Sequence, residues 1–459
     1  MIPIKPKHQP SIMEAAVSFI FIIGLISYFI IGLGTAPHIP ILLGIFTLVV
    51  YGLLKRIPFR QLQEAMISGA SSGMGAIFLF FLIGILISSW MISGTIPALI
   101  DTGFSVIGTT WFYGIAFAVT AIIGVALGSS LTTTATIGVA FIGMAGAMDA
   151  SFAITAGAIV SGAFFGDKMS PLSDTTNLAS TIVGVDLFEH IRHISLTTIP
   201  AFIISFILFV ILSPENSGSA SLNRVEEYQT ALQSANMIHW ASWIPLIVLI
   251  ICTVFKVPAF IALMASSSVA TLSASITGNL TWSEIWTIWF NGYTGSTGFE
   301  PVNDLLTKGG INSMLFTISL VILALSFGGL LFVTGILPSM LTALQEKLQK
   351  ARSIILSTAA TAIGVNVLIG EQYLSILLTG ETYKGMYEKA GLTKKALSRT
   401  LEDAGTVINP LVPWSVCGVF IANVLGVPVL DYLPFAFFCL LSPIITILFG
   451  AKTAKIRKQ

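Results

Sequence analysis

Long apolar stretches separated by short polar ones run through almost the whole chain. A stretch of about 20 apolar residues is long enough to cross the hydrocarbon core of a bilayer as a helix. Such stretches lie near residues 15–33, 39–54, 73–95, 111–127, 130–148, 194–213, 239–255, 258–277, 311–336, 353–369, 404–424 and 432–450, with an interrupted one at 151–183. A shorter apolar segment at 371–380 has the length of a half-helix or re-entrant segment. The pattern predicts an all-α polytopic membrane protein with about 11–14 membrane segments.

The composition supports a membrane protein and argues against a soluble, nucleic-acid-binding or disulfide-rich protein. Of the 459 residues, 55% are hydrophobic and 9% are charged, whereas soluble domains carry about 25% charged residues. The net charge of +1 gives no indication of a basic surface that would bind nucleic acid. The three cysteines lie in apolar runs without CxxC spacing, so neither a disulfide framework nor a thiolate metal site is indicated. We expect the lipid bilayer as the surroundings, no cofactor and no nucleic-acid partner.

Charged residues gather in the linkers between the apolar stretches. Basic linkers lie around 55–60, at 192, at 347–352, at 384–399 and at the C-terminal end, whereas the loops 214–238 and 278–310 are net acidic. Cytoplasmic loops of membrane proteins carry an excess of Lys and Arg. We therefore expect both chain ends to be cytoplasmic, in a multi-pass protein, and the acidic loops to be external.

Three segments of the first half recur about 240 positions later in the second half. The pairs are SGTIPAL (93–99) with TGILPSM (334–340), SPLSDTT (170–176) with NPLVPWS (409–415), and GVDL (184–187) with GVPV (426–429). A common spacing indicates a duplication, with a first repeat at 1–213, an external linker at 214–238 and a second repeat at 239–459. Seven membrane segments before the linker would invert the second copy. Inverted-topology repeats with broken or re-entrant helices are typical of secondary transporters, which bind their substrates near the midplane.

The most unusual stretch is SGAFFGDKMSPLSDTTNLAS, residues 161–180, because it places charge inside an apolar span. Pro171 cannot continue a helix, so the span should unwind around residues 169–173. Each buried charge of Asp167, Lys168 and Asp174 would cost about 2.5–3.5 kcal/mol at a helix centre, so these side chains need a partner, a cavity or an ion. An unwound segment at membrane depth is itself tolerated only where it is buried in protein or lines a cavity.

Oxygen atoms dominate around this predicted break. Asp167 and Asp174 supply carboxylates that would bind Na+, and neutral oxygens come from Ser170, Ser173, Thr175, Thr176 and Asn177. Hard cations prefer such oxygen ligands. Burial favours a protonated carboxyl and a nearby cation favours an ionised one, so one aspartate can exchange a proton for Na+. The alternative is structural: Asp167 and Lys168 would form an ion pair, and Asp174 would cap the following helix.

The second repeat offers weaker candidates. Thr406 and Asn409 lie in the segment that matches the break, which has no acid at the place of Asp174. Glu402 and Asp403 are compatible with a solvated helix start or with a role in the site, and the preference for acids in first turns favours the solvated start. Asn366 and Glu371 fall in an apolar region and are possible residues of a pathway. By this assignment the first half supplies the charge and the second half mostly neutral oxygens.

The stretch FFGDKMSPLSDTTNLAS (164–180) resembles the NhaC family of sodium/proton antiporters, which includes relatives that exchange malate for lactate with protons and sodium. The resemblance implies electrochemically driven antiport in a bacterial plasma membrane. It implies Asp167 and Asp174 as ion and proton carriers, with Ser170, Thr175, Thr176 and Asn177 around them. It does not decide between Na+/H+ exchange driven by the proton gradient and Na+- and H+-coupled exchange of an organic acid.

Two classes of function therefore stay open from the residues. Cation/proton antiport needs acids and neutral oxygens, whereas exchange of a small carboxylate needs a positive charge or helix N-termini to hold the anion. Lys168 is the buried base nearest the break and would serve the second class; as a counter-ion of Asp167 or Asp174 it would serve the first. No HExxH motif or nucleophile–base pair points to an enzyme.

Overall fold

The computed structural model describes residues 6–106, 110–214, 219–277, 280–345 and 351–453, and the regular elements among them are helices. The basic residues predicted at 347–350 and the end of the C-terminal tail lie outside the described residues. The elements of the first half are α1 (Ile12–Ser27), η1 (Tyr28–Gly32), α2 (His38–Leu54), α3 (Phe59–Ser72), α4 (Met74–Ile92), α5 (Thr95–Val106), α6 (Phe112–Leu127), α7 (Ser130–Thr133), η2 (Thr134–Gly138), α8 (Val139–Ala147), α9 (Phe152–Met169), α10 (Asp174–Val183), α11 (Leu187–Leu212) and α12 (Ser219–Ser234).

The second half is also helical. Its elements are η3 (Trp240–Trp243), α13 (Ile244–Val254), α14 (Ala259–Thr277), α15 (Trp282–Asn291), α16 (Glu300–Leu306), α17 (Ile311–Val333), α18 (Ile336–Gln345), α19 (Ala351–Ile369), α20 (Gln372–Lys389), α21 (Lys394–Leu401), η4 (Glu402–Thr406), η5 (Asn409–Leu411), α22 (Val416–Leu425), α23 (Val429–Tyr432), η6 (Leu433–Phe435) and α24 (Phe437–Thr453).

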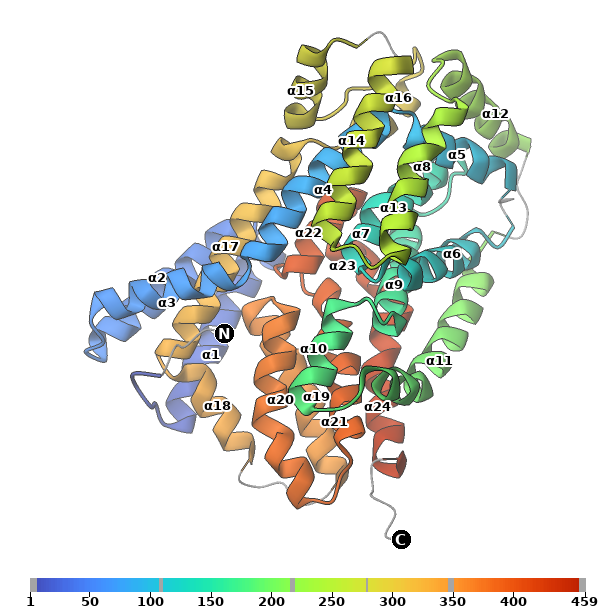
Figure 1. Cartoon of the computed structure of the whole chain (residues 1–459). Coiled ribbons are helices and arrows are strands. Elements are labelled where there is room, and N and C mark those ends of the chain that lie inside the picture. Colours follow the sequence, from blue (N-terminus) through green and yellow to red (C-terminus); the bar gives the residue numbers. More distant parts are fainter. Residues whose placement is uncertain (1–5, 107–109, 215–218, 278–279, 346–350, 454–459) are drawn as a thin grey trace.

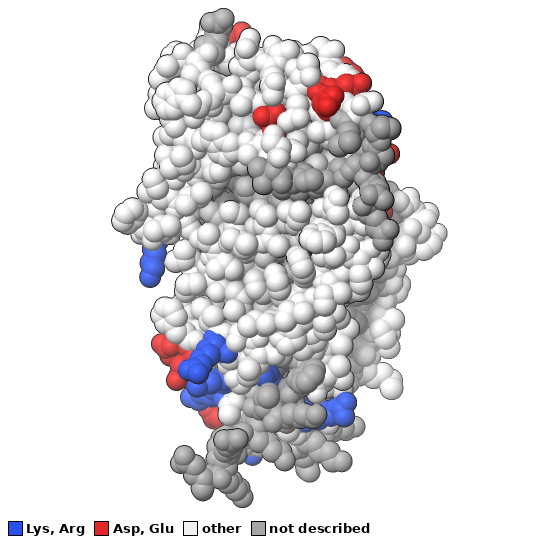
Figure 2. All heavy atoms as spheres, turned by 90° about the vertical axis from the view of Figure 1, so that its right-hand side faces the viewer, with Lys and Arg blue, Asp and Glu red and all other residues white. Residues whose placement is uncertain are grey.

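The bundle has two different ends joined by an apolar middle. Helices α12, α15 and α16 lie at one end, and the turn between α20 and α21 lies at the other, together with the end of α24 (Figure 1). On the face in Figure 2 the first end carries mainly acidic side chains, most Lys and Arg lie near the second end, and the band between them is nearly free of charge. This is the charge distribution expected of a chain embedded in a bilayer.

The apolar helices fit a multi-pass membrane protein. By length and composition, the described part has seven helices able to cross a membrane, or up to nine if each of two bent helix pairs counts as one span, and three shorter apolar helices of 10–17 residues. The expected 11–14 segments are reached only if these shorter helices cross as well. The prediction of a polytopic all-α fold with broken helices is confirmed.

Corresponding turns of the two halves have the same backbone conformation at a constant shift of 242 positions. Gly128 and Gly370 are both left-handed, with φ of +65° and +72°, and so are Gly184 and Gly426, each at +73°. Helices α10 and α22 have 10 residues each and begin after a serine whose side chain caps the helix, Ser173 and Ser415 respectively. This shift pairs Pro171 with Pro413, so the sequence-based pairing of Pro171 with Pro410 was wrong by three residues.

The direction of the helices fits inverted copies. Residues along α3 and α4 meet α17 in reverse order, because Gly69 lies against Leu325 and Gly329, whereas Gly84 lies against Gly310. Helices α4 and α17 precede the left-handed Gly94 and Gly335, which correspond at a shift of 241 positions, so these counterparts run antiparallel. The boundaries of the two repeats and of the linker stay a prediction.

Two predicted elements differ from the structure. The apolar segment at 371–380 is not a half-helix: α20 has 18 residues, because its helical pattern continues through the polar residues 381–389. The span predicted at 404–424 is instead a helix pair, Lys394–Leu411 and Val416–Leu425, bent by 46°. The bend separates Leu411 from Ser415, where Pro413 cannot donate a backbone hydrogen bond.

Candidate functional site

The helix break predicted at residues 169–173 is present. Helix α9 ends at Met169 and α10 begins at Asp174, with Ser173 accepting a hydrogen bond from the Thr176 N–H through its side chain. The Asn177 amide donates to the carbonyl oxygens of Pro171 (3.1 Å) and Ser173 (2.7 Å). Asn177 therefore satisfies the backbone of the break, as a buried carbonyl group requires a partner.

Asp167 is held against the start of another helix. Its side chain is 5% exposed, and its Oδ2 accepts a hydrogen bond of 3.2 Å from the backbone N–H of Ser130. The chain reaches Ser130 through Gly128, where a Cβ atom would lie 2.6 Å from that of Leu172. Only glycine combines the left-handed conformation with this close approach, so Gly128 brings the start of α7 onto the break.

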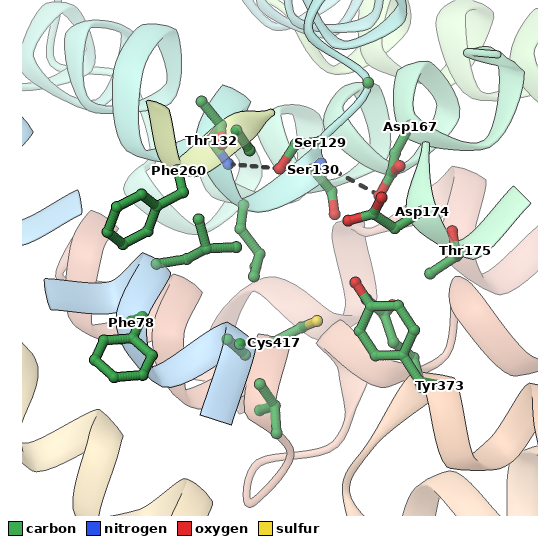
Figure 3. A pocket seen from close by; sticks show the side chains of 18 of the residues that line it. Phe78, Ser129, Ser130, Thr132, Asp167, Asp174, Thr175, Phe260, Tyr373 and Cys417 are labelled. Carbon is green, nitrogen blue, oxygen red and sulfur yellow. Dashed lines mark hydrogen bonds between the residues drawn. The ribbon is translucent and has the colours of Figure 1, made fainter. Parts of the chain in front are cut away.

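Asp174 lies at the first position of α10 and is exposed. In Figure 3 the carboxyl groups of Asp167 and Asp174 face one another beside Ser130, and the Tyr373 ring lies below them. The two carboxyl groups, one on each side of the break, therefore lie at one edge of a cavity.

The cavity has a volume of about 900 Å³ and is built from both halves of the chain. The starts of four helices contribute to its lining, namely residues 128–132 before and within α7, residues 172, 174 and 175 at α10, 371–374 at α20 and 416–417 at α22. Its carboxyl groups belong to Asp167, Asp174 and Glu371, and the basic side chain that lines it in the described part of the chain is Lys256. The lining is thus acidic and combines equivalent segments of the two repeats.

Other predicted oxygen donors of the break do not line the cavity. Thr175 does, but Ser170, Ser173 and Thr176 are buried, and their hydroxyl groups bond within or beside the break. Ser173 Oγ lies 3.0 Å from Thr175 Oγ1, and Thr176 Oγ1 donates to the Lys168 carbonyl oxygen over 3.3 Å. In this conformation these hydroxyl groups stabilise the break between the two acids and do not line the cavity.

Lys168 has a different partner from the two predicted. Its ammonium group pairs with Asp403 of the second half and donates to Ser442 Oγ over 2.9 Å. Asp403 also accepts hydrogen bonds from Thr197 (2.8 Å) and Ser442 (3.0 Å). Sequence reasoning missed this pair because its members are 235 positions apart, and the prediction that Lys168 pairs with Asp167 or Asp174 was wrong.

The favoured assignment of Glu402 and Asp403 to a solvated helix start was also wrong. Both side chains are fully buried, and Glu402 accepts a hydrogen bond of 3.0 Å from Thr406. The basic stretch before them does not remain a linker but folds into α21, whose Arg399 is buried as well. The second half therefore supplies buried charge, contrary to the expectation that it supplies mostly neutral oxygens.

The candidates Asn366, Thr406 and Asn409 are buried and do not line the cavity. Asn409 donates to Asn366 Oδ1 over 2.8 Å and accepts from the Cys417 N–H over 2.9 Å, while Asn366 donates to the Gly405 carbonyl oxygen over 2.6 Å. These amides join α19, the bent segment and α22. Their hydrogen bonds make them part of the packing of the second repeat.

Sequence reasoning missed Ser130, Gln372 and Tyr373 as lining residues. Ser130 falls at the start of the predicted span 130–148, and Gln372 and Tyr373 fall in the apolar segment 371–380. The shift of 242 pairs Ser130 with Gln372 and was the signal that could have found them. Among the described residues no three His, Cys, Asp or Glu side chains form a metal-binding group, so a cation in the cavity would need neutral oxygen ligands too.

A multi-pass helical protein with acids at a helix break, beside a cavity between two related halves, has the architecture of a secondary transporter. The model of the Na+/H+ antiporter family matches residues 162–452. The Na+/H+ antiporter NhaC of Alkalihalophilus pseudofirmus is 44% identical, covering 90% of each chain. That of Bacillus subtilis is 39% identical over 94% of this chain and 96% of its own. The malate-2H+/Na+-lactate antiporter of Bacillus subtilis is 31% identical over 97% and 96%. The chain belongs to the Na+/H+ antiporter family.

Proposed function

We propose that this protein exchanges Na+ for H+ across a bacterial plasma membrane, driven by the proton gradient. The observation that carries the proposal is the pair of facing carboxyl groups, Asp167 and Asp174, at a helix break on the edge of an acidic cavity. Family membership and the greater similarity to the NhaC antiporters than to the malate/lactate antiporter support the same function.

The proposed exchange is a competition for the same oxygens. A carboxylate that binds Na+ must be ionised, and a carboxyl group that holds a proton has lost the charge that attracts the ion. Both carboxyl groups line the cavity, and that of Asp167 is also positioned by the Ser130 N–H. Alternating exposure of the pair to the two sides of the membrane would then couple inward proton movement to outward sodium movement. Transport in this scheme involves no covalent step.

Exchange of an organic acid is the less supported alternative. Its candidate for holding a carboxylate, Lys168, is bound to Asp403 and does not line the cavity. Acidic side chains outnumber Lys256 in the lining, and repulsion by these acids disfavours an anion. A malate- or lactate-dependent component is therefore an outcome to test.

The proposal is tested with the purified protein in proteoliposomes under an imposed pH gradient. Addition of Na+ should dissipate the gradient to the same extent with and without malate or lactate. Dissipation that requires malate or lactate would favour the organic acid exchanger, and no sodium-dependent dissipation would reject both functions.

We also propose the orientation and division of the chain that the charges predict. Both termini would be cytoplasmic, and α12, within the 214–238 linker, would be external, with repeats at 1–213 and 239–459. The test uses Val225→Cys and Ala390→Cys in a background that lacks Cys252, Cys417 and Cys439. An impermeant thiol reagent on intact cells should label position 225 and leave 390 unlabelled, and the reverse pattern would reject this orientation.

A further inference from the structure

We propose that Glu371 and Gln372, at the start of α20, form a second sodium-binding locus in the same cavity. This inference rests on the proposed function and extends it. The acids of the proposed exchange, Asp167 and Asp174, lie in the first half of the chain, whereas this locus lies in the second. Its ligand class is a small monovalent cation bound by a carboxylate and an amide oxygen.

Glu371 combines a structural contact with access to the cavity. Its side chain is 7% exposed and lines the cavity, and one carboxyl oxygen, Oε2, accepts a hydrogen bond of 2.7 Å from the Leu374 N–H. A helix N-terminus carries about half a positive charge, so a full carboxylate charge at this position leaves the wall negative. This part of the cavity wall therefore attracts a cation, although the positive end of the helix dipole lies there.

Gln372 supplies the independent observation. Its side chain is 6% exposed and lines the cavity, and its Oε1 has no hydrogen-bond partner within the described part of the chain. A buried carbonyl oxygen normally has a partner. An alkali cation next to the Glu371 carboxylate would provide one, because hard cations take oxygen ligands.

The surroundings leave the Glu371 charge available. Lys256, the base that lines the cavity in the described residues, is exposed, and none of the ion pairs found there joins it to Glu371. The arrangement also repeats that of the first half, where Gly128 turns the chain into the helix that begins at Ser130. Gly370 does the same before Gln372, so in each half the helix start that follows this glycine lines the cavity.

The test is equilibrium binding of radioactive Na+ to the purified full-length protein in lipid nanodiscs. The wild type should bind two ions per chain, and Glu371→Gln should bind one. The glutamine side chain keeps an oxygen that can accept the hydrogen bond from the Leu374 N–H. If Glu371 acted only as a helix cap, the number of bound ions would therefore stay the same. The matched control is Glu388→Gln, an exposed acid on the same helix, which should bind two.

Gln372→Leu gives a second measurement that retains the Glu371 charge. Loss of one oxygen ligand should weaken the second ion about tenfold and leave the first unchanged, and this variant decides the matter if Glu371→Gln does not fold. One ion per wild-type chain, or two sites of unchanged affinity in the variants, would overturn the second locus while sodium-dependent proton movement stands. Absence of that movement in the wild type would instead reject the proposed function.

Discussion

The two helix breaks occupy equivalent places in the two halves but have different chemistry. The first break has Asp167 and Asp174, and the shift of 242 places Asn409 and Val416 at the corresponding positions of the second. Asp167 accepts from a backbone N–H of another helix beside the cavity, whereas Asn409 is bonded within its own repeat. An amide can neither exchange a proton near neutral pH nor bring a charge to a cation, so the first break is suited to ions and the second to packing.

This difference shows that two segments with the same backbone conformation can carry different chemistry. Both halves retain the left-handed glycine and the serine cap, because these positions determine where the chain turns. The residues around them differ between the two halves. Charge in the second half lies at Glu371 on the cavity wall and at the buried Glu402 and Asp403.

The largest predicted effect on stability concerns the ion pair that joins the halves. Lys168→Gln should lower the free energy of unfolding by about 3–5 kcal/mol, because it leaves the buried Asp403 without its counter-ion. The double variant Lys168→Gln/Asp403→Asn should recover most of this loss. Denaturation of the detergent-solubilised protein measures both.

The control is Lys395→Gln, which removes an exposed ion pair with Glu189 and should change stability by less than about 1 kcal/mol. A single variant as stable as wild type would contradict this role of the pair.

The next effect separates packing from ion binding. Asn409→Leu should cost about 1–3 kcal/mol of unfolding free energy, since the Cys417 N–H and the side-chain oxygen Oδ1 of Asn366 lose their partner. Sodium affinity in radioactive Na+ binding should be unchanged. The matched variant at the first break, Asp167→Leu, should lose sodium binding there. Loss of sodium binding in a stable Asn409→Leu protein would show that the second break also handles ions.

A comparison of two left-handed glycines in the first half distinguishes a turn that supports the site from one that does not. Gly184→Ala should cost about 1–2 kcal/mol, because the left-handed conformation is strained and the space around it is open. Gly128→Ala should cost about 1–3 kcal/mol more, because its Cβ would collide with Leu172 and push the start of α7 away from Asp167. Thermal unfolding and sodium affinity check both. Equal melting temperatures and unchanged affinity would show that the contact at Gly128 does not position the acid.

The sequence predicted those features that depend on local chemistry. Charges in an apolar span and a proline that breaks a helix are costly wherever the span lies, so the break and its two acids could be placed before the structure. The constant spacing of the repeat likewise depends only on positions along the chain.

Features that depend on distant partners could not be predicted. Lys168 meets Asp403 only after the halves pack together, and an acidic helix start has the same local sequence whether it faces water or the interior. Gln372 was missed because the segment 371–380 is mostly apolar, and the sequence does not show which side chains of α20 line the cavity.

The central claim is that exchange takes place at the first break. Its most direct test measures sodium-dependent dissipation of a pH gradient in proteoliposomes containing Asp174→Asn, with Val416→Ala at the equivalent position as the matched control. Asparagine keeps the shape of the side chain at an exposed position, so the protein should fold and reconstitute normally. The account predicts that dissipation falls to background in Asp174→Asn and stays near the wild-type rate in Val416→Ala. A wild-type rate in Asp174→Asn would contradict it.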